Sequence, residues 1–171
     1  MADTCFLYSA NRDAKILILG SMPGQKSLTD NQYYAHPQNA FWAIMGELIG
    51  FDVTLGYEKR LERLRGSGVA LWDVAHQCVR PGSLDSAIEI ESVVANAFEL
   101  FFKAHPHIRA ICFNGRKAEE LYLKLALPHI SAEFQKIERH LLPSTSPANA
   151  AMNRTQKLAA WEIVRQTLES D

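Results

Sequence analysis

Apolar positions along the chain form short continuous runs separated by longer stretches with helical spacing. Four short runs, at 15–19, 69–74, 109–113 and 136–142, are typical of strands. The first is almost wholly apolar, as expected for a strand buried on both faces at the centre of a sheet. The last is more polar, which favours the edge of the sheet.

Between these runs, apolar residues recur every three or four positions, as they do on one face of a helix. Such stripes lie at 41–48, 94–101, 118–125 and 158–168. Strands that alternate with helices of this length predict βαβ units and a parallel sheet. We therefore expect an α/β fold, a three-layer α/β/α sandwich around a central, mainly parallel four-stranded sheet.

Length and composition fit one domain, so we read residues 1–171 as a single unit. Hydrophobic residues make up 47% and charged residues 22% of the 171 residues, and the formal net charge is -1. These values are ordinary for a globular protein. They give no basic field that would indicate nucleic acid, but backbone N–H groups and hydroxyls can also hold phosphates.

Cys5, Cys78 and Cys112 are scattered without the spacing of metal ligands. The N-terminus carries no charged-then-apolar signal segment, and no stretch approaches membrane-spanning length. The sequence also lacks a P-loop and a GxGxxG fingerprint. We therefore expect a cytoplasmic monomer that has no metal, no cofactor and no membrane contact.

Each predicted strand ends in a polar loop. The first is followed by Gly-Ser-Met-Pro-Gly at 20–24 and, further on, by Tyr-Ala-His-Pro-Gln-Asn at 34–39. Polar segments at 72–85 and 113–116 follow the second and third, and Pro-Ser-Thr-Ser-Pro-Ala-Asn at 143–149 follows the fourth. Any one loop could be turn chemistry alone. Because the carboxyl ends of parallel strands meet at one edge, four such loops predict a binding cleft there.

On these motifs the sequence resembles the uracil-DNA glycosylase superfamily, and within it the hypoxanthine-DNA glycosylase branch. The resemblance covers most of the chain, from residue 15 to about residue 161. The segment 20–24 is similar to the first active-site motif of the superfamily, and 34–42 is similar to its continuation. The segment 142–149 is similar to the second motif, a loop that enters the minor groove of DNA.

The resemblance also shows two departures from the best-known members. Their water-activating carboxylate, an asparagine in mismatch-specific relatives, is replaced by Met22, which cannot accept a proton from water. Their histidine that steadies the leaving base is replaced by Leu142. The resemblance implies that Asn39 is catalytic instead. Since an amide orients water but is no general base, the glycosidic bond would largely break before water attacks.

The resemblance implies a base pocket built from Gly20, Ser21, Met22, Tyr34 and Asn114. Tyr34 stands where the superfamily stacks an aromatic ring on the extruded base, although Tyr33 and Tyr34 could simply pack the loop. Asn114 could read the Watson–Crick edge of that base, or it could be a left-handed turn residue before Gly115. We read His36, in a His-Pro turn, as a hydrogen-bonded scaffold rather than an acid or base.

The second motif supplies the expected DNA contacts. The residues expected to hold phosphates through hydroxyl, amide or backbone N–H groups are Ser144, Thr145, Ser146 and Asn149. Relatives insert an apolar wedge from this loop, but no large apolar residue stands between Pro143 and Pro147. Further phosphate contacts could come from Arg80, Arg116, Lys117 and Arg154.

The leading hypothesis is a monofunctional DNA glycosylase of base excision repair. It would flip a deaminated base, hypoxanthine or uracil, out of DNA and hydrolyse its N-glycosidic bond, so its partner is DNA containing a deaminated base. Neither motif contains a lysine, so strand cleavage through a Schiff base is not expected. The alternatives are a non-catalytic damaged-DNA-binding module of the same fold and a hydrolase of free nucleosides or nucleotides.

Overall fold

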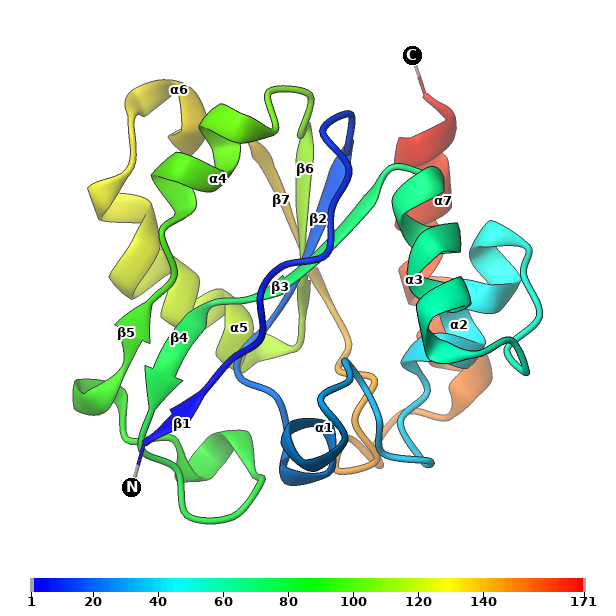
Figure 1. The fold of residues 1–171 in the computed structure, drawn as a ribbon, viewed down its shortest axis with the longest axis horizontal. Coiled ribbons are helices and arrows are strands. Elements are labelled where there is room, and N and C mark those ends of the chain that lie inside the picture. The colour runs from blue at the N-terminus through cyan, green and yellow to red at the C-terminus, as the bar shows by residue number, and fades with distance from the viewer. Residues whose placement is uncertain (1, 171) are drawn as a thin grey trace.

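The computed structural model describes residues 2–170 and is built around a four-stranded parallel sheet (Figure 1). Across the sheet, the strands lie in the order β3 (Val69–Asp73), β2 (Ile16–Gly20), β6 (Ala110–Asn114), β7 (Glu138–Leu142). All three neighbouring pairs are parallel. The four expected strands are therefore confirmed, with the most apolar run inside the sheet and the polar run at its edge.

Helices cover both faces of this sheet, which confirms the three-layer sandwich (Figure 1). One face carries α2 (Phe41–Ile49), α3 (Tyr57–Gly66) and α7 (Arg154–Glu169). The other face carries α4 (Phe98–Ala104), α5 (Arg116–Leu121) and α6 (Ala132–Gln135).

The apolar core is divided between the two sides of the sheet. Strand side chains alternate between faces, so Ile16 and Ile18 pack with α2 and α7, whereas Leu17 and Leu19 pack with α4 and α5. All four side chains are fully buried. Burial on both faces explains why this run is continuously apolar instead of alternating.

A second, small antiparallel sheet was not expected from the sequence. It has the order β1 (Asp3–Thr4), β4 (Ala75–Cys78), β5 (Val94–Ala95). The helical stripe expected at 94–101 is therefore wrong at its start, because Val94 belongs to β5 and α4 begins only at Phe98. The pairing of β5 with β4 overrides the helical spacing of the sequence.

Two further helices lack the wide apolar stripe that would have revealed them. In α1 (Gln25–Asp30) the only buried residue is Ser27, and α3 buries Leu61 and Leu64 alone. The position of α1 matters for function, because it follows directly on the 20–24 turn at the carboxyl end of β2.

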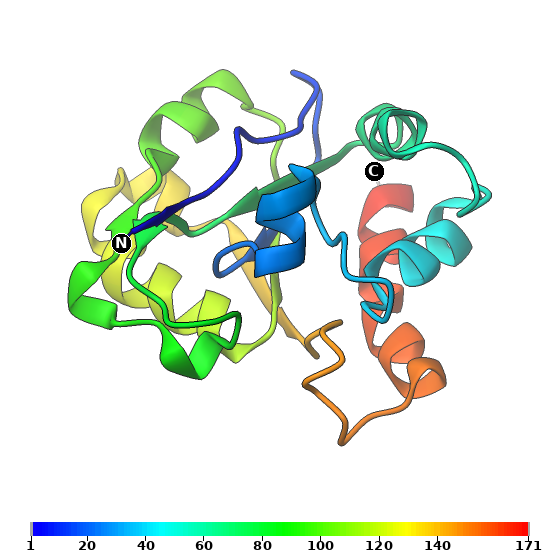
Figure 2. The ribbon, with the colours of Figure 1, turned by 60° about the horizontal axis from the view of Figure 1, so that its bottom comes forward.

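The strand order creates a switch point between β2 and β6. From β2 the chain crosses to β3 on one side, and it later returns to form β6 on the other side. In open α/β sheets, ligands bind in the crevice outside the carboxyl ends of strands at such a point. Figure 2 turns this end of the molecule forward, with α1, the segment before α2 and the loop after β7 around it.

Candidate active site

A cavity of about 490 Å³ lies at this switch point. Its size is in the range of small-molecule sites, and its walls come from the loops at the carboxyl ends of all four strands. The structure brings every candidate site residue to its lining: Gly20, Ser21, Met22, Tyr34, Asn39, Asn114, Ser144, Thr145, Ser146 and Asn149.

The 20–24 turn forms one wall of the cavity. A Cβ atom on Gly20 would lie 2.5 Å from Oδ1 of Asp73, so close packing requires glycine here. Ser21 donates a hydrogen bond from Oγ to Oδ1 of Asp85, at 2.6 Å. The Met22 side chain is buried in the apolar core and brings no proton acceptor.

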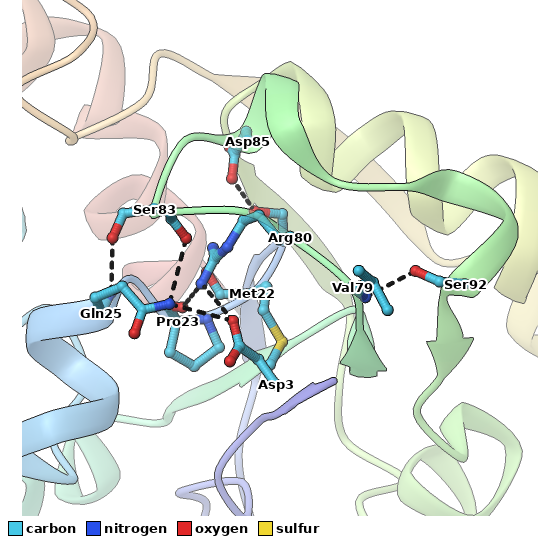
Figure 3. A network of polar contacts seen from close by, with 11 residues as sticks. Asp3, Met22, Pro23, Gln25, Val79, Arg80, Ser83, Asp85 and Ser92 are labelled. Atoms are coloured by element: carbon cyan, nitrogen blue, oxygen red, sulfur yellow. Dashed lines mark hydrogen bonds and ion pairs between the residues drawn. The ribbon is translucent and has the colours of Figure 1, made fainter. Parts of the chain in front are cut away.

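Arg80 holds this turn in place, and Figure 3 shows its guanidinium beside Met22, Pro23 and Asp3. Its guanidinium donates to the carbonyl oxygens of Pro23 at 2.5 Å and Met22 at 3.4 Å, and lies 3.5 Å from a carboxylate oxygen of Asp3. The Arg80 side chain is fully buried. The expectation that Arg80 contacts a phosphate is therefore wrong, because its guanidinium is buried and bonds to the carbonyl oxygens of the first motif.

Asn39 stands at the start of α2, where its amide has a defined orientation. Its Oδ1 accepts a hydrogen bond from the backbone N–H of Phe41 at 2.9 Å, which closes an Asx turn directly before the helix. Its Nδ2 donates to no residue within the described part of the chain, 2–170. The residue is half-buried and lines the cavity, so the free NH₂ group is available to a ligand.

Tyr34 is held in an unusual backbone conformation, with φ at 55°. Non-glycine residues at positive φ are uncommon and often mark functional sites. Its ring stacks on Phe41 with centroids 3.9 Å apart, so a base could stack only on the opposite face. Its hydroxyl is buried without a hydrogen-bond partner among residues 2–170. Burial raises the pKa of Tyr34 well above its usual range, which keeps the phenol neutral.

Two hydrogen bonds join Asn114 and Thr145 across the carboxyl ends of β6 and β7. Asn114 donates from Nδ2 to Oγ1 of Thr145 at 3.0 Å and accepts from the Thr145 backbone N–H at 2.9 Å. The turn alternative for Asn114 is not realised, since the positive φ belongs to Gly115. Thr145 is 1% exposed, and both its hydroxyl and its backbone N–H bond to Asn114.

The rest of the 143–149 loop is ordered by its own polar groups. Oγ of Ser144 accepts from the backbone N–H of Ser146, and Oγ of Ser146 accepts from that of Ala148, both at 3.2 Å. Asn149 donates from Nδ2 to the Ser144 carbonyl at 3.2 Å. Ser144, Ser146 and Asn149 stay partly exposed, so they can still meet a ligand.

Helix α7 anchors this loop to the body of the protein. Trp161 donates from Nε1 to the Pro143 carbonyl at 2.9 Å, and Lys157 donates from Nζ to the Ser146 carbonyl at 3.2 Å. Trp161 is fully buried, and Lys157 is 5% exposed. The two bonds fix the beginning and the middle of the loop relative to the sheet.

Two carboxyl groups at the cavity, Asp73 and Asp85, were missed as candidate site residues. Asp73 ends β3 and is 3% exposed, and its Oδ2 has no hydrogen-bond partner in residues 2–170. Burial, with a smaller effect of Asp85 that outweighs Arg80, raises the pKa of Asp73 from 3.8 to about 7. The available signal was a lone acidic residue closing an otherwise apolar strand at the ligand-binding edge.

The other polar residues near the site have simpler roles. Arg116 and Arg154 are exposed, and Lys117 pairs with Glu120 at 3.2 Å. His36 accepts the backbone N–H of Gln38 at Nδ1, at 3.1 Å, as expected for a turn scaffold. Residues 2–170 contain no group of three His, Cys, Asp or Glu side chains placed to hold a metal ion. Over the same range, every helix is too short or too polar to cross a membrane.

Comparison with known proteins identifies the family of this fold and site. The family model of the uracil DNA glycosylase superfamily matches residues 7–166. Two similar relatives are named hypoxanthine DNA glycosylase. The one from Methanosarcina acetivorans is 37% identical over 155 residues, covering 90% of this chain and 92% of its own length. The one from Methanosarcina barkeri is 39% identical over 152 residues, covering 88% and 90%.

A solved structure agrees with these sequence comparisons. The solution NMR structure of a candidate uracil DNA glycosylase from Methanosarcina acetivorans matches this fold with a TM-score of 0.82 and 37% sequence identity. The match covers 99% of this chain and 100% of that chain. On its fold, its motifs and its sequence, the chain belongs to the uracil DNA glycosylase superfamily.

Proposed function

We propose that this protein is a DNA glycosylase that binds a deaminated base, hypoxanthine or uracil, in the cavity and hydrolyses its N-glycosidic bond. The relatives named hypoxanthine DNA glycosylase support this function, since they match along about nine-tenths of the chain. They favour hypoxanthine as the first substrate to test. Extrusion of the base costs a few kcal/mol and is easiest for a mispaired base, which adds selectivity.

The observation that carries the proposal is the fixed amide of Asn39. The Phe41 N–H occupies one lone pair of its oxygen, which sets the orientation of the amide and leaves the NH₂ group free. This group can hold a water molecule or steady charge on the sugar–base bond, but it cannot remove a proton. The reaction therefore proceeds through an oxocarbenium-like sugar that water then traps.

The remaining walls of the cavity suit a planar base. The open face of the Tyr34 ring offers a stacking surface, which is worth about 1–3 kcal/mol per base. Asn114 keeps a second amide N–H and a second oxygen lone pair beyond its bonds to Thr145, and these can pair with the edge of the base.

The chain also offers groups that can bind the DNA backbone. Ser144 and Ser146 present hydroxyls beside the cavity, and exposed Arg116 and Arg154 can add charge. Lys26 also lines the cavity, where its ammonium pairs with the carboxylate of Asp30 at 3.0 Å. We propose glycosidic hydrolysis without strand cleavage.

Within a cell, we propose that the protein acts in base excision repair as a cytoplasmic monomer. Size-exclusion chromatography with light scattering tests the monomer directly.

The test is base release from a labelled duplex with one deoxyinosine opposite thymine. The wild type should leave the strand intact until hot alkali is added, and alkali should then break it at the abasic site. Matched duplexes with uracil or undamaged adenine define selectivity. Strands that resist alkali for every damaged base, despite tight binding to them, would instead show a non-catalytic binding module.

Variants at Asn39 separate catalysis from the structural role of the Asx turn before α2. Asn39→Ser keeps an oxygen that can accept the Phe41 N–H but removes the amide NH₂ group, whereas Asn39→Ala removes both. We expect both variants to lose base release by at least about 10²-fold, with Asn39→Ser retaining wild-type stability. Asn11→Ser, at an exposed position, is the matched control. Full activity of Asn39→Ser would leave Asn39 with the structural role in the turn alone.

A further inference from the structure

The carboxyl group of Asp73 has no partner in the protein although it lines the cavity. Its side chain makes no hydrogen bond to any residue between 2 and 170, and its Oδ2 is enclosed. Asp73 pairs with Gly20 in the sheet register, and its Oδ1 lies 2.5 Å from the position where a Gly20 Cβ would stand. The Tyr34 hydroxyl lies 3.4 Å from that same position.

Structural needs of the fold do not account for this carboxyl. Arg80, the cation that acts on the pKa of Asp73, directs its Nη1 and Nη2 atoms to Met22, Pro23 and Asp3 instead. The Asp73 backbone carbonyl does have a structural role, since it accepts from Asn96 Nδ2 at 2.7 Å. A buried polar group without a partner is unfavourable and rare in native proteins, and it indicates a group that is completed by a ligand.

We propose that Asp73 is a catalytic residue which, as a neutral acid, donates a hydrogen bond to the extruded base and gives it a proton as the glycosidic bond breaks. The inference rests on the proposed function of the same cavity. It supplies what Asn39 and Met22 cannot, because neither of these side chains can release a proton to a leaving group.

The proton balance of this step is simple. When the bond from C1′ to the base nitrogen breaks, its electron pair stays on the base. The carboxyl proton of Asp73 moves to an acceptor nitrogen or carbonyl oxygen of the base, which leaves as a neutral molecule, and Asp73 becomes a carboxylate. Water then adds its oxygen to C1′ and releases a proton to solvent, from which Asp73 is protonated again.

The environment of Asp73 favours the acid form that this step requires. Its pKa is raised to about 7 by burial first and by the neighbouring Asp85 second, while Arg80 opposes both. The titratable and charged groups that interact with Asp73 are Asp85, Arg80, Tyr33, Tyr34 and Cys5. Burial keeps the two tyrosines and the thiol neutral, so after the burial of Asp73 itself the remaining influences on its pKa come from Asp85 and Arg80.

The test is single-turnover release of hypoxanthine by the full chain between pH 5.5 and 9. The wild-type rate should fall about tenfold per pH unit above the pKa of Asp73, because the acid form is lost. Asp73→Asn should be about 10²-fold slower at pH 6 and independent of pH, so the gap narrows as pH rises. Asp13→Asn, an exposed aspartate in a turn, should follow the wild type. A constant ratio of Asp73→Asn to wild type at every pH would overturn the proposal.

Two further measurements separate the possible failures. Asp85→Asn removes the like charge, so the falling limb of the pH profile should move to lower pH, and an unmoved limb contradicts the assigned group. Carbon NMR of the aspartate carboxyls should show one resonance, absent in Asp73→Asn, that titrates near pH 7. A wild type that releases no base from any damaged duplex refutes the proposed function, whereas normal release by Asp73→Asn refutes only this inference.

Discussion

The buried carboxyl of Asp73 makes the stability of the fold depend on pH, and Asp73→Asn should remove that dependence. The group has a pKa near 3.8 when exposed and about 7 in the folded protein. Below pH 4 it is protonated in both states and has no net effect. Between pH 4 and 7 only the folded state holds the proton, so stability falls as pH rises. The full fall is on the order of 4 kcal/mol, at about 1.4 kcal/mol per pH unit.

Urea unfolding of the wild type and Asp73→Asn, measured at each half unit from pH 5 to 8, gives this quantity directly. Other groups titrate over the same range, but they cancel in the difference between the two proteins. The amide cannot ionise, so the stability of Asp73→Asn relative to the wild type should increase by about 2–3 kcal/mol from pH 5 to pH 7. Above the folded pKa the difference should level off.

A difference between the two proteins that stays constant across this range would contradict the raised pKa of Asp73. The side chain would then be ionised in the folded state, as it is in the unfolded chain. The parallel variant Asp13→Asn should show no such trend, since the Asp13 side chain is exposed.

Three other substitutions test how the site is held. Gly20→Ala should lower base release at least about tenfold and destabilise the fold by about 1–3 kcal/mol in urea unfolding, because the new Cβ would meet Asp73 at 2.5 Å. Arg80→Met should cost about 3 kcal/mol and should raise the protease sensitivity of the 20–24 turn, whose carbonyls lose their charged donor. Trp161→Phe keeps a buried ring but loses the bond to the Pro143 carbonyl, so fluorescence anisotropy should show weaker DNA binding while stability changes by only about 1 kcal/mol.

The sheet and the location of the site were predictable because they rest on local patterns. A continuously apolar run such as 16–19 is buried on both faces of a sheet wherever it occurs, and Gly20 ends the strand. Parallel strands then force their following loops to one edge, so the cavity position followed from the order of elements. The small antiparallel sheet could not be predicted from the sequence, because β1 and β5 have two residues each and are too short to show an alternating hydrophobic pattern.

The roles of individual side chains were less predictable because they depend on contacts distant in sequence. Arg80 resembles a surface cation in the sequence, but the folded chain buries it under a turn almost 60 positions away. Thr145 resembles a phosphate ligand, but its hydroxyl and N–H meet Asn114 across the sheet. Nothing in a single sequence reports such pairings.

The sheet register explains how a site without a carboxylate in its first motif can still contain one. Gly20 and Asp73 are direct partners on adjacent parallel strands. With no side chain on Gly20, the Asp73 carboxyl occupies space that any larger residue would fill. A carboxylate on the 20–24 turn would be a third acid at the cavity beside Asp73 and Asp85, and like charges there would repel. Met22 in the turn is therefore compatible with Asp73 on β3, because the acid group reaches the cavity from the neighbouring strand.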